Sequence, residues 1–322
     1  MSKVRILSLD GGGLRGIIPL LILKKIEEQQ GKKIHELFDI IVGTSTGGII
    51  ACGLTCTKDG VNPYLTVDKL IDLYTKNGGV IFPYKKNIFS KIIKGANSIF
   101  NPKFSPDGLD GLLTQYFGDL KLSNTLKPIV VTSYDLRNNE IVMFKSRKSN
   151  EPECDVLLKD VCRATSAAPT YLPSYEMNYN GKNRVCIDGG VFINNPSMAA
   201  VAEVLKWGID GADIKLKDIS CLSLGTGMYT DNLGVKNTPS WGVVNWAQPI
   251  TTVMMQSTSA ATVYECEQVL SNFLRLQVTI DDKDRSDMSD SRKETLDYIT
   301  SRVNDQIINN SDIQKSIVKF FK

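Results

Sequence analysis

Three short stretches carry the residue types that could perform chemistry in this chain. Residues 10–16 (DGGGLRG) offer backbone N–H groups, residues 43–47 (GTSTG) offer a serine hydroxyl, and residues 188–190 (DGG) offer a carboxylate. A hydroxyl nucleophile, a base and N–H groups that hold a developing negative charge are the parts needed for acyl transfer. The first question is whether one fold can bring them together.

Ser45 stands in a G-x-S-x-G motif between an apolar stretch (38–42) and a helical pattern (48–56). In this context the motif is typical of a sharp strand-to-helix turn that exposes a nucleophilic serine. The turn needs very small residues two positions before and after the serine, and Gly43 and Gly47 meet that need. The motif therefore predicts Ser45 at the carboxyl end of a strand, beside a helix N-terminus that favours negative charge.

The first glycine loop has two interpretations. Gly11, Gly13 and Gly16 fit the G-x-G-x-x-G spacing of a dinucleotide-binding loop, but that site needs an acid at the end of the second strand. Asp39 instead lies near the start of that strand. We therefore favour the second interpretation, in which Gly11, Gly12 and Gly13 direct N–H groups at a carbonyl attacked by the serine.

The base is not expected to be a histidine. The only one, His35, precedes the second strand and so lies at the end opposite Ser45, roughly 16 Å away for a five-residue strand. Asp188 follows a short buried-strand candidate (185–187) and would reach the same edge of the sheet as Ser45. Burial raises the pKa of a carboxyl group and makes it a stronger base, so a serine–aspartate pair is chemically reasonable.

These residues need a parallel sheet to position them. The opening order strand, loop, helix, strand, loop, helix predicts an α/β fold with helices on both faces. The expected strands are residues 4–9, 38–42, 128–133, 185–187 and 219–224. The expected helices are residues 15–30, 48–56, 67–76, 109–117, 197–207, 294–308 and a capped final helix from 311. The charged stretch 281–294 is expected to be a solvated surface loop that leads into a helix.

The bulk properties indicate a soluble, cytosolic protein. The 322 residues carry a net charge of +3, which is too small to suggest nucleic-acid binding. No apolar run approaches the roughly 18–20 residues of a membrane span, and the N-terminus lacks a signal-peptide core. The seven cysteines are scattered without a C-x-x-C pair, so we expect small buried residues rather than a metal site.

One segment, residues 78–106, combines apolar and basic residues and contains no acid. Two interpretations stay open: a cap over the active-site cleft, or a surface that meets anionic lipid. Its lysines are Lys85, Lys86, Lys91, Lys94 and Lys103. Further along, Trp241, Trp246, Met254 and Met255 either pack in the core, which we favour, or line a pocket for an acyl chain.

Taken together, the motifs resemble the patatin-like phospholipases. The three motifs occur in the family's order, and residues 163–171 (RATSAAPTY) and 223–227 (SLGTG) resemble the family as well. The likeness covers about residues 4–227. It implies a three-layer α/β/α fold with a mostly parallel sheet, a Ser45–Asp188 dyad, and an oxyanion hole at Gly11, Gly12 and Gly13 with Arg15 nearby. The resemblance also implies that Gly189 and Gly190, which follow Asp188, are motif glycines, as Gly43 and Gly47 are around Ser45.

The prediction is therefore a single domain, residues 1–322, whose C-terminal part (228–322) is helical and carries no motif. It acts as a metal-independent, cofactor-free serine esterase that releases fatty acids from phospholipids or related glycerolipids through an acyl-enzyme. We expect a cytoplasmic protein that meets the membrane transiently and binds no nucleic acid. Two alternatives remain: a catalytically silent lipid-binding or regulatory protein, and a dinucleotide-dependent oxidoreductase.

Overall fold

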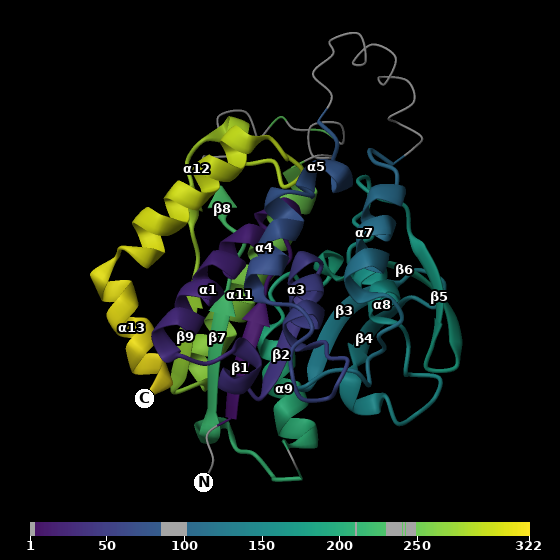
Figure 1. Ribbon diagram of the computed structural model, residues 1–322, viewed down its shortest axis with the longest axis horizontal. Coiled ribbons are helices and arrows are strands. Elements are labelled where there is room, and N and C mark those ends of the chain that lie inside the picture. Colours follow the sequence, from purple (N-terminus) through teal and green to yellow (C-terminus); the bar gives the residue numbers. More distant parts are fainter. Residues whose placement is uncertain (1–3, 85–101, 210, 230–239, 241, 243–248) are drawn as a thin grey trace.

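The computed structural model is a three-layer α/β/α protein built on an eight-stranded, mostly parallel sheet (Figure 1). It describes residues 4–84, 102–209, 211–229, 240, 242 and 249–322. The strand order is β5-β6-β3-β2-β1-β7-β9, with β4 also paired to β3. The expected α/β/α fold is confirmed.

The central strands are parallel and the strands at one side are antiparallel. Strands β1, β2, β3, β7 and β9 run in the same direction, whereas β4 and β6 run against β3. The sheet strands are β1 (Val4–Leu9), β2 (Ile40–Thr44), β3 (Ile129–Asp135), β4 (Glu140–Lys145), β5 (Tyr175–Tyr179), β6 (Lys182–Asp188), β7 (Ile219–Leu224) and β9 (Asn272–Leu276). A separate pair, β8 (Met228–Tyr229) and β10 (Thr279–Ile280), lies outside this sheet.

Alternate residues of the buried strands enter two separate cores, one on each face of the sheet. Leu7 and Ile41 pack on one face, while their neighbours Ile6 and Ile40 pack on the other. The first face is covered by α1 (Ile17–Gln30), α2 (Ile34–Leu37), α3 (Thr46–Thr55), α4 (Val67–Thr75), α7 (Asp107–Phe117), α8 (Leu158–Thr165), α12 (Lys293–Val303) and α13 (Ser311–Phe321). The second face is covered by α9 (Ser197–Trp207) and α11 (Pro249–Val269).

Strand β3 has one edge that two other strands share. Strand β4 pairs along the other edge of β3, from Val130 to Asp135. On the shared edge, β2 pairs with β3 up to Thr132. Antiparallel β6 pairs from there on, with Asp188 aligned to Ser133. The end of β2 and the end of β6 therefore meet along this edge.

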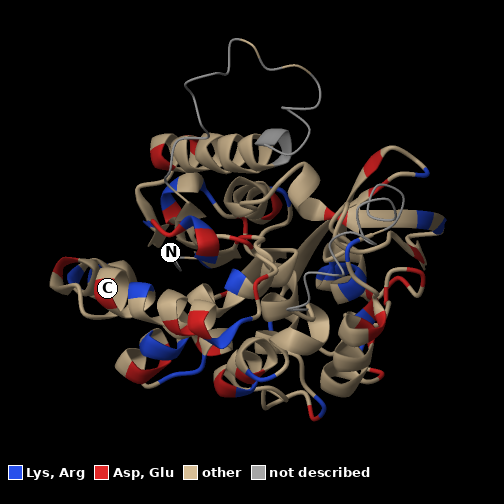
Figure 2. Cartoon of the chain, turned by 90° about the horizontal axis from the view of Figure 1, so that it is seen from above, with Lys and Arg blue, Asp and Glu red and all other residues tan. Residues whose placement is uncertain are grey.

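The C-terminal part contributes more than the helices expected for it. Strand β9 extends the sheet beside β7, so the expectation of a purely helical end is incomplete. Side chains of α12 and α13, such as Ile299 and Phe320, belong to the same core as Leu7 of β1. Along the described part of the ribbon, positions of Lys and Arg are interspersed with positions of Asp and Glu (Figure 2).

Candidate active site

Ser45 occupies a tight turn between β2 and α3. Its backbone has φ 54° and ψ −123°, a conformation that few residues other than glycine adopt. A Cβ on Gly43 would overlap the carbonyl of Gly47, and a Cβ on Gly47 would overlap the carbonyl of Leu9. The motif glycines are thus required by close backbone approach, as the sequence predicts.

A second contact holds the turn in place. The Ser45 N–H donates to Thr165 Oγ1 over 2.8 Å, and that hydroxyl donates to the Thr132 carbonyl over 2.6 Å. Thr165 ends α8 and belongs to the RATSAAPTY segment, whose role was not assigned from the sequence. Thr165 of α8 and Thr132 of β3 therefore fix the position of Ser45 in addition to the turn itself.

Ser45 and Asp188 lie close together, and the serine hydroxyl favours the charged form of the carboxyl group. Both side chains are buried, with relative exposures of 9% for Ser45 and 6% for Asp188. Burial raises the pKa of Asp188 to about 6, although the nearby Ser45 hydroxyl and the hydrogen bond from the Gly190 N–H favour the carboxylate. The Gly190 bond measures 2.8 Å, and a Cβ on Gly189 would overlap Thr132, so this turn is also tightly packed.

The glycine loop lies against the same turn but does not direct all its N–H groups at the serine. The Gly11 N–H donates to the Asn194 carbonyl over 3.2 Å, which corrects the expectation that it faces an oxyanion. No hydrogen bond from the Gly12 or Gly13 N–H is found among the described residues. These two groups remain the candidate oxyanion donors.

The stretch 281–294 is more than a surface loop, which corrects the expectation for it. The Met288 carbonyl accepts from the Leu14 N–H over 2.9 Å, and the Ser286 carbonyl accepts from Arg15 Nη1 over 3.2 Å. Ser289 and Asp290 are buried. Stretch 281–294 therefore anchors the glycine loop through hydrogen bonds to Leu14 and to the side chain of Arg15.

A buried ion pair lies directly before the glycine loop. Asp10 and Arg275, on β9, form two hydrogen bonds of 2.9 and 2.5 Å, and Arg275 also donates to Ser223 Oγ over 2.8 Å. Burial raises the pKa of Asp10, and the guanidinium opposes that shift by favouring the carboxylate. Arg275 was missed because its segment carries no motif.

The described residues at the two ends of segment 78–106 pack against Tyr171 and stretch 281–294. Phe104 stacks on Tyr171 and contacts Phe82 edge-on, and Ser291 Oγ donates to the Phe82 carbonyl. Lys103 pairs with Asp287 at 3.4 Å. The other lysines of the segment (Lys85, Lys86, Lys91 and Lys94) lie outside the described residues.

The residues considered for an acyl pocket divide into two groups. Trp241 and Trp246 lie outside the described residues. Met254 is half exposed, whereas a Cβ on Gly190 would lie 3.5 Å from Met255 Cε. Met255 therefore reaches the turn that carries Asp188.

The residues of the alternative sites lie elsewhere. His35, on α2, precedes β2, whereas Ser45 follows that strand, and burial lowers the pKa of the imidazole. Asp39 accepts from the Arg5 N–H at the start of the sheet, so it is not the acid of a dinucleotide site. Across the described ranges, no group of three or more His, Cys, Asp or Glu residues is arranged to hold a metal ion.

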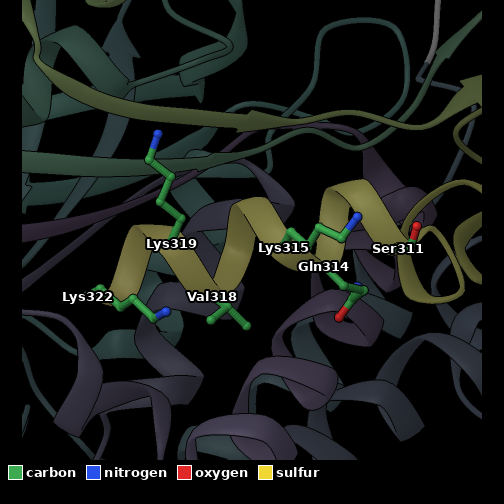
Figure 3. Close-up of a pocket in the computed structure, with 6 residues that line it drawn as sticks. All are labelled: Ser311, Gln314, Lys315, Val318, Lys319 and Lys322. Carbon is green, nitrogen blue, oxygen red and sulfur yellow. The ribbon is translucent and has the colours of Figure 1, made fainter.

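The hollow drawn in Figure 3 is not part of the site. Its lining comes from one helix, α13, and includes Lys315, Val318 and Lys319. At the end of that helix, the Phe321 carbonyl accepts a hydrogen bond from Arg5, near the start of β1. The start of β1 is at the opposite end of the parallel strands from Ser45. None of the helices in the described residues is long and apolar enough to span a bilayer.

Comparison with known proteins agrees with these motifs. The family model described as Patatin-like phospholipase matches residues 7–201. Patatin-like protein 2 of Arabidopsis thaliana is 32% identical over 95% of this chain and 83% of its own length. Patatin-like protein 2 of Oryza sativa subsp. indica is 31% identical over 93% and 82%, and Patatin-07 of Solanum tuberosum is 28% identical over 86% and 76%. The chain therefore belongs to the patatin-like phospholipase family.

Proposed function

We propose that this chain is a serine lipid acyl hydrolase that releases fatty acids from phospholipids or related glycerolipids. The observation that carries the proposal is the position of the Ser45 hydroxyl beside the buried carboxylate of Asp188, whose charged form it favours. A carboxylate with a raised pKa takes a proton more readily than an exposed one, which makes a histidine unnecessary.

The proposed reaction has two halves. Asp188 accepts the Ser45 proton as the oxygen attacks the ester carbonyl, and the Gly12 and Gly13 N–H groups hold the oxyanion. Asp188 then gives the proton to the leaving alcohol, and an acyl group remains on Ser45. Water releases the fatty acid in the second half. No step requires a metal, so activity is expected to persist in excess chelator.

The experiment that tests the proposal is labelling with a fluorophosphonate probe, followed by mass spectrometry. The probe should modify Ser45 and no other serine, and the Ser45→Ala variant should remain unlabelled and release no fatty acid. A wild-type protein that folds, binds lipid vesicles and neither reacts with the probe nor hydrolyses esters would instead be the silent lipid-binding protein.

We also propose that the chain is a single domain of the cytoplasm that meets a membrane surface transiently. Segment 78–106 carries exposed apolar side chains at Val80 and Tyr84 near its start and the lysine Lys103 near its end. Arg292 lies over the Tyr84 ring at 5.1 Å. Apolar side chains with nearby cations are suited to an anionic lipid surface.

A further inference from the structure

Asn194 presents a buried amide oxygen to both members of the dyad. A methyl group built on Gly11 would lie 2.5 Å from Asn194 Oδ1 and 3.2 Å from Ser45 Cβ. A methyl group built on Gly190 would lie 3.4 Å from the same Oδ1 and 3.2 Å from Asp188 Oδ1. The amide oxygen therefore lies next to the glycine loop and near both the serine and the carboxylate.

The backbone around Asn194 is fixed on both sides. Its carbonyl accepts a hydrogen bond from the Gly11 N–H. The carbonyl of the preceding residue, Ile193, accepts a hydrogen bond from Thr44 Oγ1 over 2.8 Å. The following side chain, Asn195, accepts through its Oδ1 from the hydroxyl of Ser197 over 2.6 Å. The orientation of this segment is thus set by contacts that do not involve the Asn194 side chain.

The Asn194 oxygen itself is unsatisfied. It is buried and has no hydrogen-bond donor within the described residues. A buried acceptor without a donor destabilises the folded state, so buried polar atoms in proteins are nearly always paired. An acceptor that no protein group of the described ranges satisfies, beside a nucleophile and its base, is available to a water molecule bound there.

We propose that Asn194 is a catalytic residue of the second half-reaction, in which it orients the hydrolytic water. The inference rests on the proposed acyl-enzyme mechanism. A water molecule has two O–H bonds: one faces the Asp188 carboxylate, and the other donates to Asn194 Oδ1. With both bonds directed, a lone pair of the water oxygen faces the acyl carbon.

The proton and electron balance is complete with water alone. One water proton moves to Asp188 while the water oxygen forms a bond to the acyl carbon. The bond between that carbon and Ser45 Oγ then breaks, and the proton on Asp188 moves to the serine oxygen. The fatty acid leaves, and both side chains return to their initial protonation states.

An alcohol that replaces water has one O–H bond, which faces Asp188, and needs no second acceptor. Asn194 therefore favours water over alcohols as the acceptor of the acyl group. Loss of the amide should slow hydrolysis and leave alcoholysis much less affected. The ratio of ester to free acid among the products reports this choice directly.

The test compares wild-type protein with Asn194→Ala in a p-nitrophenyl butyrate reaction that contains methanol. The variant should form methyl butyrate and butyric acid in a ratio about tenfold higher than wild type, the effect expected for one lost hydrogen bond in a transition state. Its rate of fluorophosphonate labelling at Ser45 should stay within about threefold of wild type, because labelling uses no water.

Ser197→Ala is the matched control. It removes a hydroxyl from the adjoining Asn195 contact and leaves the Asn194 side chain intact, so the product ratio should equal that of wild type. An unchanged ratio in Asn194→Ala would overturn the inference, and so would an equal change in both variants, since the effect would then be structural. Absence of Ser45 labelling in wild type would instead reject the proposed function.

Discussion

Thr44 and Asp188 are aligned with consecutive residues of β3, Thr132 and Ser133, on the same edge of that strand. Strand β2 leaves this edge after Thr44, and β6, which runs the other way, ends where β2 stops. Ser45 is the first residue beyond β2. The two residues of the proposed dyad therefore lie where two strands meet end to end, and this arrangement leads to specific predictions.

The first prediction concerns the pH dependence of turnover. Asp188 must be ionised to accept the serine proton, so kcat/KM should fall about tenfold per pH unit below pH 6, which is the pKa given by burial. Esterase assays between pH 4.5 and 8 measure this fall in kcat/KM. The His35→Gln variant should show the same fall below pH 6. If the fall disappeared in that variant, the histidine would be the base.

The second prediction concerns stability and the same carboxyl group. Its folded pKa, about 6, lies above the value of about 3.9 expected in the unfolded chain, so ionisation disfavours folding. This cost is absent below pH 4 and fully present above pH 6. Asp188→Asn should therefore be inactive yet more stable at pH 8, by about 2–3 kcal/mol.

Urea unfolding at pH 4 and pH 8 tests this prediction. The stability difference between Asp188→Asn and wild type should shrink towards zero at the lower pH. An equal difference at both pH values would show that the substitution acts through packing rather than through the charge.

The third prediction concerns the backbone of Ser45. Its positive φ favours glycine, and such conformations cost other residues about 1–3 kcal/mol. Ser45→Gly should therefore be about 1 kcal/mol more stable than Ser45→Ala in chemical denaturation. Both variants lack the hydroxyl, so the comparison isolates the backbone. Equal stabilities would mean that the turn stores no strain.

The fourth prediction concerns the ion pair before the glycine loop. Arg275→Met leaves Asp10, which is 2% exposed, without its partner, and breaking such a pair typically costs about 3–5 kcal/mol. The double variant Asp10→Asn with Arg275→Met should recover part of that loss, because no charge remains buried. A double variant less stable than the single one would contradict this explanation.

The fifth prediction concerns the membrane surface. Reversing the charge of Lys85, Lys86, Lys91 and Lys94 should weaken sedimentation with anionic vesicles more than it slows hydrolysis of a soluble ester, since each lysine near the surface contributes about 1 kcal/mol. Equal losses in both assays would indicate that the segment acts as a cap over the site.

Local patterns predicted most of the elements, and they predicted that Ser45 and Asp188 reach the same place in the fold. Residues 197–207 and 219–224 form the helix and the strand expected from their periodicity. Ser45 could be found because its turn needs specific small residues at fixed spacing. Asp188 also lies near Ser45 as expected, although β6 is antiparallel and approaches the serine along the shared edge of β3 rather than as a neighbouring parallel strand.

The rest depends on contacts between residues far apart in the sequence. Arg275 meets Asp10 across 265 positions, and no local pattern marks either as a pair. Met288 and Ser286 hold the glycine loop through their carbonyls, which every residue type carries. The N–H of Gly11 is taken by a carbonyl at Asn194 in the same way. Because nearly all residue types carry the same backbone groups, main-chain contacts of this kind cannot be predicted from residue type.

The register between β6 and β3 also determines which length changes this gene can tolerate. An insertion in the turn between β5 and β6, around Gly181, leaves every pairing of β6 intact. One extra residue within β6 would move the carboxylate by about 3.3 Å along the strand and turn it to the other face of the sheet. Natural and engineered variants should therefore accumulate indels in that hairpin and exclude them from the six residues before Asp188.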